Sequence, residues 1–376
     1  MSTAIQKGSI LVHRVFDIAG EISLVRAEQL LSADSKGPRL KFATDTRKAI
    51  IIKDSPLKTD LGEEVLDLPS GKFPVGIFAR VWNYGVISVT LELAIPPGTD
   101  WGRLVKTAAE LEASSELELL AVSRKDALKK RIMPAVINPA EWEIHEDYIT
   151  YIIEKADGLE NPREFVRKVD VAALILAEEK EHLVDEHRTF LVESAIQYSS
   201  SDLAIIDWNS ALLIEPEGQR DVADVIEFSL THLLEFRYYD EMLSRNLEEL
   251  YDAMESKRES VANIFRNFYA DIAEDSSRKY MEFSEFLGRV ENSLKTVGDP
   301  YLAVAFRASA QEFHFDDWRK SISRKMETLA QISQILHGEV NTRRSHWLEI
   351  IIIVLIAVEM IPMAVDLWKY LRTLGG

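Results

Sequence analysis

The feature that most constrains this chain is an uninterrupted apolar run near its C-terminus, residues 350–358 (IIIIVLIAV). After the single acid Glu359, apolar residues continue over 360–365. A helix over 348–371 would be about 36 Å long at about 1.5 Å per residue, which exceeds a hydrocarbon core of roughly 30 Å. The run therefore predicts one transmembrane helix, preceded by a body that folds separately.

The flanks of this run agree with a membrane span, while its centre opposes one. Aromatic and basic residues flank it on both sides: Arg343, Arg344, Trp347, Trp368, Lys369, Tyr370 and Arg372. Glu359 costs about 2.5–3.5 kcal/mol near the centre of a span, and eight Ile and Leu residues over 348–361 offset it at roughly 0.3–0.6 kcal/mol each. A buried helix of a water-soluble domain remains the alternative.

The acids of this helix predict contact with protein. Glu359 and Asp366 are seven residues apart and share one stripe with Met363, while Pro362 frees a carbonyl one turn back. A lipid-facing carboxylate is penalised, so the simplest neighbour is the same helix in a second copy. We therefore expect a homo-oligomer that uses this helix and the seam over 322–340. The expected membrane and oligomer interface consists of Arg343, Arg344, Trp347, Glu349, Glu359, Pro362, Met363, Asp366 and Trp368.

Charge and composition exclude several classes of protein. The chain has 62 Asp and Glu against 44 Lys and Arg, a net charge of −18, which makes nucleic acid an improbable partner. It contains no cysteine, so disulfides, thiolate nucleophiles and cysteine metal sites are excluded.

The pattern of strands and helices predicts an α+β N-terminal part, then long antiparallel helices, then the transmembrane helix. Residues 73–82 and 86–95 flank Asn83-Tyr84-Gly85, a hairpin signal, and polar residues alternate through the second strand, so one of its faces should be solvated. Residues 203–208 and 211–214 form another expected hairpin. The expected parts are 1–139 (α+β), 140–217 (a second β-containing unit), 218–342 (long helical or coiled-coil region) and 343–376 (membrane anchor).

Few residues in the sequence indicate a catalytic, cofactor-binding or metal-binding site. The chain has no glycine-rich phosphate loop and no G-x-S-x-G motif, so we expect no cofactor. Asp202 and Asp207 flank a short strand and could act as bases or metal ligands, but five residues apart they point to opposite faces. We therefore predict no metal site. Charged residues on the first long helix form a possible partner face: Glu227, Glu235, Arg237, Asp240 and Glu241.

Residues 343–359 (RRSHWLEIIIIVLIAVE) resemble the C-terminal signature of the YagE-like family, also called the sporulation or required for meiotic nuclear division family. That family has no known biochemical activity, so the resemblance implies no catalytic residues. It implies the same plan of an α+β part, long helices and one C-terminal membrane helix.

With no signal peptide in residues 1–20, we expect a single-pass, tail-anchored membrane protein with its body in the cytoplasm, or on the matrix side if mitochondrial. The expected function is a scaffold or tether that presents its acidic helices to protein partners at the lipid bilayer. The alternative is a membrane-attached metal-dependent enzyme that uses acids near Asp202 and Asp207.

Overall fold

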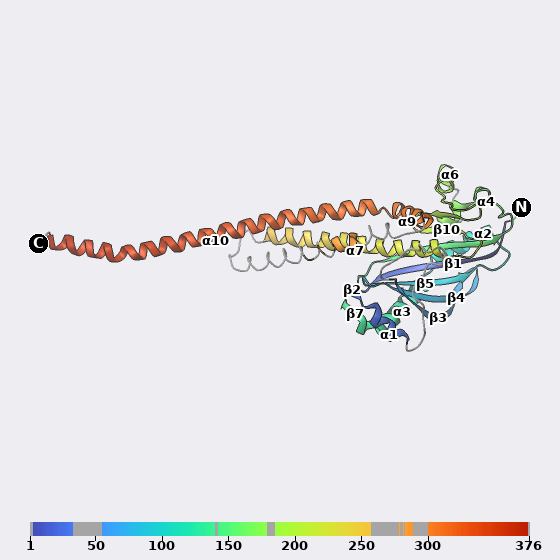
Figure 1. The fold of residues 1–376 in the computed structure, drawn as a ribbon, viewed down its shortest axis with the longest axis horizontal. Coiled ribbons are helices and arrows are strands. Elements are labelled where there is room, and N and C mark those ends of the chain that lie inside the picture. The colour runs from blue at the N-terminus through green and yellow to red at the C-terminus, as the bar shows by residue number, and fades with distance from the viewer. Residues whose placement is uncertain are drawn as a thin grey trace. The chain divides into compact units, whose positions relative to one another are not determined.

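The computed structural model describes residues 3–32, 55–139, 142–178, 185–256 and 300–374, together with 278, 281 and 283–288. The chain divides into two compact units (Figure 1). The first comprises Met1–Tyr239 with Leu287–Arg319, and the second comprises Asp240–Phe286 with Lys320–Gly376.

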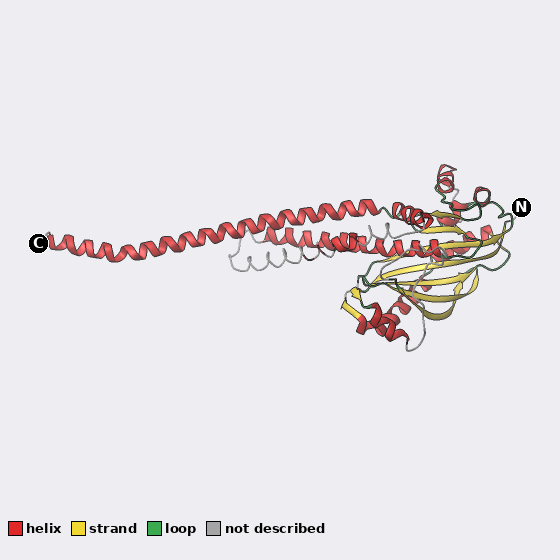
Figure 2. Cartoon of the chain, in the orientation of Figure 1, coloured by secondary structure: helices red, strands yellow, loops and turns green. Residues whose placement is uncertain are grey.

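The first unit is built on an eight-stranded sheet in the order β3-β4-β5-β1-β8-β10-β9, with β6 paired to β1 (Figure 2). Neighbouring strands are antiparallel except β8 and β10, which are parallel. The strands are β1 (Ala4–Asp17), β3 (Leu57–Leu68), β4 (Gly71–Val81), β5 (Val86–Ala94), β6 (Thr99–Asp100), β8 (His145–Ala156), β9 (Leu203–Ile206) and β10 (Ser210–Ile214). A separate two-stranded sheet pairs β2 (Ala19–Ile22) with β7 (Val136–Pro139).

The helices of the first unit begin at residues suited to that position. Asp100 and Ser114 accept hydrogen bonds from backbone N–H groups at the starts of α2 (Trp101–Glu112) and α3 (Ser115–Ile132). α2 and α3 are therefore separate helices, because Ser114 caps the second one. Across both units, the other described helices with defined bounds are α1 (Leu24–Ser32), η1 (Met133–Ala135), α4 (Pro162–Lys168), α5 (Val171–Ile175), α6 (Asp185–Glu193), α7 (Asp221–Ser256), α9 (Pro300–Glu312) and α10 (Phe315–Leu374).

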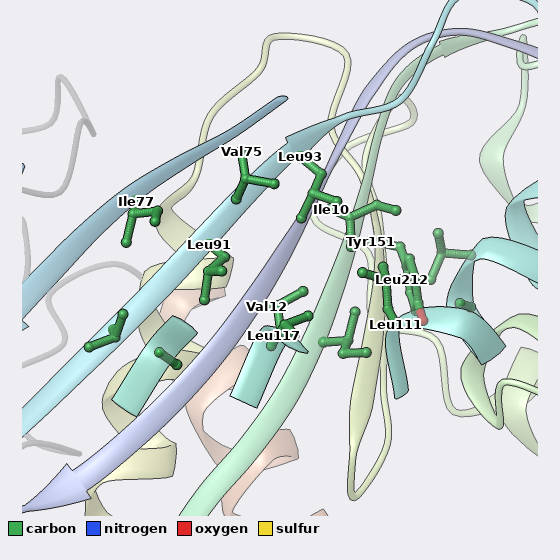
Figure 3. Close-up of a cluster of buried hydrophobic side chains, with 14 of the residues drawn as sticks. Ile10, Val12, Val75, Ile77, Leu91, Leu93, Leu111, Leu117, Tyr151 and Leu212 are labelled. Atoms are coloured by element: carbon green, nitrogen blue, oxygen red, sulfur yellow. The ribbon is translucent and has the colours of Figure 1, made fainter. Parts of the chain in front are cut away.

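One face of the large sheet is apolar and forms the main core (Figure 3). Side chains from five strands meet α2 and α3 there: Ile10, Val12, Val75, Ile77, Leu91, Leu93, Tyr151 and Leu212, against Leu111 and Leu117. Side chains alternate across a strand, so every second residue of β1, β4 and β5 points to the other face. That other face carries buried polar and charged side chains among apolar ones, and α7 packs against it.

The predicted hairpins are confirmed as β4–β5 and β9–β10. β8, which belongs to the expected second β-containing unit 140–217, pairs directly with β1 of the first 139 residues along their length. The polar face of β5 is not solvated as expected: Ser88 and Thr90 are fully buried.

In the second unit, the start of α10 packs against the C-terminal part of α7. Ser321 and Lys325 both contact the Asp240 carboxylate, at 2.7 and 2.6 Å, and Lys325 also donates to Ser244 Oγ at 2.7 Å. Apolar residues at helical spacing are buried in this unit: Leu243, Leu250, Ile322, Met326 and Leu329. The expected packing of the two helices within one chain is present, but they run parallel, and the antiparallel arrangement is wrong (Figure 1).

The prediction of a transmembrane helix is wrong. In the part of the chain that the structure describes, no helix is both long enough and apolar enough to cross a membrane. Although α10 has 60 residues, its uncharged run is bounded by Glu349 and Glu359. The nine apolar residues 350–358 extend only about 14 Å, roughly half of a hydrocarbon core. The single-pass membrane localisation and tail anchor expected from this run, with a cytoplasmic or matrix-side body, are therefore unsupported.

The turn between β4 and β5 provides a test of the fold. Gly85 has φ of +93°, and a Cβ there would lie 1.5 Å from the backbone oxygen of Ala19. We predict that Gly85→Ala lowers the free energy of unfolding by more than about 2 kcal/mol, since left-handed strain adds to a backbone clash.

Chemical denaturation followed by circular dichroism measures this loss. Gly76→Ala in β4 is the matched control, because nothing lies within 4 Å of a Cβ added there. Equal stability of the two variants would contradict the proposed close approach of the turn to Ala19.

Candidate functional site

The most unusual feature of the first unit is a set of charged and polar side chains sealed between the sheet and α7. We define the buried charged layer as His13 of β1, Arg80 of β4, Ser88 and Thr90 of β5, and Glu227 of α7, together with Asp224 of α7, whose side chain is 12% exposed. The strand residues share one face of the sheet because their positions alternate with those of the apolar core. On α7, residues 224 and 227 are three apart and so lie on one face of the helix.

The centre of the layer is an ion pair between Arg80 and Glu227, whose side chains are 4% and 1% exposed. Arg80 Nη2 also donates to Asp224 Oδ1 at 2.5 Å, and Ser88 Oγ donates to Glu227 Oε1 at 2.6 Å. Removing two charges from water is costly, so such a pair is tolerated only where further hydrogen bonds compensate. Arg80 therefore joins β4 to two positions of α7, and Ser88 joins β5 to one of them.

His13 occupies the layer as a neutral imidazole. Its Nδ1 lies 3.0 Å from Thr90 Oγ1 and 3.8 Å from Glu227 Oε2. Burial, together with the positive charges of Arg80, Arg14 and Arg220, lowers the pKa of His13 from 6.5 to about 3. Among the described residues, His13 Nε2 has no hydrogen-bond partner.

Two further side chains, Arg220 and Tyr84, hold α7 at either end of the layer. Arg220, just before α7, donates to Glu92 at 2.5 Å and to Ser9 at 3.2 Å. Tyr84, in the β4–β5 turn, has its hydroxyl 2.6 Å from Thr231 Oγ1. The first three turns of α7 are thus fixed to the sheet by directional contacts as well as by apolar packing.

The burial of this layer defines its chemistry. Since His13, Arg80 and Glu227 are each at most 4% exposed, a substrate could reach them only if α7 left the sheet. The layer is suited to fixing the position of α7, and it lacks the access that an active site needs. The alternation of polar residues over 86–95 was the sequence signal for the buried charged layer. Alternation alone does not show whether a polar face is exposed to water or covered by a helix.

The predicted partner face is divided by the structure. Glu227 and Glu235 are buried, so they are not available to a partner. Arg237 pairs with Glu146 of β8 at 2.6 Å, instead of with its helix neighbours. Asp240 binds Lys325 within the second unit, and Glu241 pairs with Arg245.

Asp202 and Asp207 stand at opposite ends of β9 and have separate structural roles. The Asp202 carboxylate accepts hydrogen bonds from the backbone N–H groups of Tyr198 and Ser199, at 2.8 and 3.0 Å. The carbonyl of Asp207 accepts from the Tyr148 hydroxyl at 2.9 Å. Within the described ranges, no group of three or more His, Cys, Asp or Glu residues could hold a metal ion.

The residues expected at a C-terminal interface lie on α10. Glu349, Glu359 and Pro362 are exposed. The side chains of the other members fall outside the described ones: Arg343, Arg344, Trp347, Met363, Asp366 and Trp368. Between Glu349 and Pro362, nine large apolar side chains are 49–63% exposed. We define them as the exposed apolar segment: Ile351, Ile352, Ile353, Val354, Leu355, Ile356, Val358, Met360 and Ile361.

Comparison with known proteins identifies relatives through the first unit. A family model described as the N-terminal domain of the uncharacterized protein MJ0711 matches residues 7–221. The uncharacterized protein MJ0711 of Methanocaldococcus jannaschii is 23% identical over 218 residues, which are 57% of this chain and 65% of that protein. This chain thus covers less than two thirds of the relative's length. No solved structure matches.

These matches correct the resemblance drawn from residues 343–359. The family found is the MJ0711 N-terminal domain family, and the assignment to the YagE-like family is wrong. The apolar run that suggested it has a simple composition that many unrelated helices share. The matched region instead begins within β1 and ends at Asp221, the first residue of α7.

The ion pair at the centre of the layer gives a first prediction for this site. Arg80→Met should cost about 3–5 kcal/mol of unfolding free energy, because it leaves Glu227 buried without its counter-charge. Arg80→Met with Glu227→Met should recover much of this loss, since no charge then remains uncompensated at that pair. Denaturant titration of the single and double variants measures the coupling.

Lys72→Met is the control on the same strand, since its pair with Asp67 has side chains that are 73% and 62% exposed. It should change stability by less than about 1 kcal/mol. An Arg80→Met variant no less stable than this control would show that the pair does not hold α7.

The pH dependence of stability gives a second prediction. The folded-state pKa of His13 lies near 3, below the ordinary value of 6.5, so between these values the unfolded chain binds more protons. The contribution of His13 to the free energy of unfolding is fully present above pH 6.5. It falls as the pH drops towards 3, by up to about 1.4 kcal/mol per pH unit.

Measured from pH 4 to 7, the stability of His13→Gln should therefore depend less on pH than that of the parent chain. Burial raises the pKa values of Asp17 and Glu146 to about 7, which gives the opposite slope in both proteins. The difference between the two curves isolates His13, and a difference that does not change with pH would contradict its neutral burial.

Proposed function

The chain belongs to the MJ0711 N-terminal domain family through residues 7–221, and we propose that it works as a self-associating scaffold that displays several copies of its α/β unit. The observation that carries this proposal is the exposed apolar segment of α10. Isolated exposed apolar residues are common in water-soluble proteins, but contiguous patches mark interaction sites. Nine such residues within eleven positions of one helix form a contiguous patch.

The spacing within the segment favours a second copy of the chain as the partner. Ile351, Val354, Val358 and Ile361 follow steps of three, four and three residues, which is the a/d seam of a coiled coil. Val358 occupies an a position, so Glu359, the next residue, faces away from the seam. Its carboxylate is therefore not desolvated when two copies associate. The seam repeats the spacing of Ile322, Met326 and Leu329, which is buried within the second unit.

The residues in and beside the seam indicate how many copies of the chain associate. β-branched side chains occupy both the a and the d positions, a pattern that favours trimers or tetramers over dimers. Ile352, Ile353 and Ile356 lie outside the seam and are also exposed. An assembly of more than two helices would cover more of this surface than a dimer, so we propose an oligomer larger than a dimer.

The first unit supplies the displayed part of the scaffold. Its buried charged layer holds α7 against the sheet, and α7 continues without a break from the first unit into the second. Arg80 and Glu227, two of its most buried ionisable groups, pair with each other. This pairing supports a role for the layer in holding α7 for display of the unit.

Sedimentation velocity of the full chain, over a hundredfold range of concentration, tests this function. We expect an oligomer that dissociates on dilution. Val354→Glu with Val358→Glu should raise the dissociation constant at least about 100-fold, because carboxylates would enter an apolar seam.

The control is Leu119→Glu with Val25→Glu, which changes two residues of the first unit that are 71% and 62% exposed. This variant should associate like the parent chain. A parent chain that stays monomeric throughout, or a control that dissociates as much as the seam variant, would overturn the proposal. Binding of monomers to phosphatidylcholine vesicles in a flotation assay, without self-association, would also overturn it.

A further inference from the structure

A cavity of about 540 Å³ lies between α4, α5 and α6 of the first unit, on elements that the proposed function does not use. Its volume falls within the range of roughly 300–1,000 Å³ typical of small-molecule sites. Apolar side chains form part of its wall: Val166, Val169, Val171, Ala172 and Val192. Val166, Val171 and Ala172 are buried and belong to the main core of the unit.

The wall of the cavity is held by contacts that do not depend on a ligand. Trp101 of α2 donates its indole N–H to the backbone oxygen of Asp170 at 2.9 Å, which ties the α4–α5 connection to the core. The Asp170 side chain also accepts the backbone N–H of Ala173, at 3.2 Å, at the start of α5. The cavity is therefore preformed, which lowers the entropic cost of filling it.

The charge of the wall differs from that of the whole chain. Arg167, Lys168 and Arg188 line the cavity with Asp170 and Glu193, so basic residues outnumber acidic ones. Over the chain the ratio is reversed, 44 basic to 62 acidic. A locally basic wall in an acidic protein favours a negatively charged ligand.

Arg188 is the best-placed side chain to recognise such a ligand. Asp170 receives its Nε–H at 3.1 Å and pairs with its Nη2, so the plane of the guanidinium is fixed. The Arg188 side chain is 41% exposed and is therefore within reach of a molecule that enters the cavity. Asp170 takes the Nε–H and an Nη2 donor, so Arg188 presents to an anion a fixed, partly exposed positive charge, while the valines suit a short aliphatic chain.

We propose that this cavity binds a small organic anion, a carboxylate or phosphate monoester carrying a short aliphatic tail. The anionic group contacts Arg188 and Arg167, and the tail lies over Val169 and Val192. A cleft that merely holds water would show no preference for charge and none for tail length. The two explanations therefore differ in measurable selectivity.

Isothermal titration calorimetry of the full chain distinguishes them, with hexanoate, hexyl phosphate, hexanol and inorganic phosphate as probes. We expect hexanoate or hexyl phosphate to bind, hexanol and inorganic phosphate to bind at least tenfold more weakly, and each methylene removed from the tail to cost about fourfold. The preferred headgroup, carboxylate or phosphate, follows from the same comparison.

Two variants of different kinds test the location. Arg188→Gln removes the positive charge, and Val192→Phe fills the cavity without altering the Arg188–Asp170 pair; each should weaken binding at least tenfold. Arg163→Gln is the control, because Arg163 lies on α4 but donates to Gln197 at 2.9 Å and does not line the cavity.

Circular dichroism verifies that each variant is folded, and a folded Val192→Phe suffices if Arg188→Gln does not fold. Equal binding of hexanol and hexanoate, no binding of any probe, or unchanged binding by Val192→Phe would overturn the proposal. None of these outcomes depends on the oligomeric state of the chain.

Discussion

The ion pair between Arg80 and Glu227 is the interaction on which the arrangement of the first unit depends. Both partners are almost completely buried, and each has lost its water, so neither tolerates removal of the other. Apolar packing alone would let a helix slide on a sheet by one turn at moderate cost. A buried charge pair with hydrogen bonds to Ser88 and Asp224 admits one position, because any other leaves charges unpaired.

The two faces of the sheet consequently have different roles. The face that packs on α2 and α3 is apolar and supplies most of the core, a contribution that tolerates substitutions of similar volume. The face under α7 contributes less apolar burial, but its directional contacts select one helix and one register. The α7 helix also extends into the second unit, where Asp240 and Ser244 bind Ser321 and Lys325.

Local elements could be predicted from the sequence, whereas their partners could not. The turn at Asn83–Gly85 and the second hairpin were predictable because turn residues and alternating strands are local signals. The polar positions 88 and 90 were correctly seen as one face, yet what covers that face is a helix about 140 residues later. Glu227 looked like a surface acid for the same reason, since its counter-charge comes from β4. The cavity beside Arg188 left no motif, because its wall comes from three short helices.

The proposed self-association must overcome the net charge of −18 on each copy, and the ranges of the two forces decide the outcome. At physiological ionic strength the repulsion between copies is screened over about 8 Å, so it acts mainly as they make contact. Apolar burial contributes roughly 25 cal/mol per Å², and it grows with every residue of the seam that is covered. Glu349 precedes the segment, and Glu359 lies within it but faces away from the seam, so the apolar side chains of the seam meet without desolvating either carboxylate. A long apolar seam can therefore associate acidic units that repel one another everywhere else.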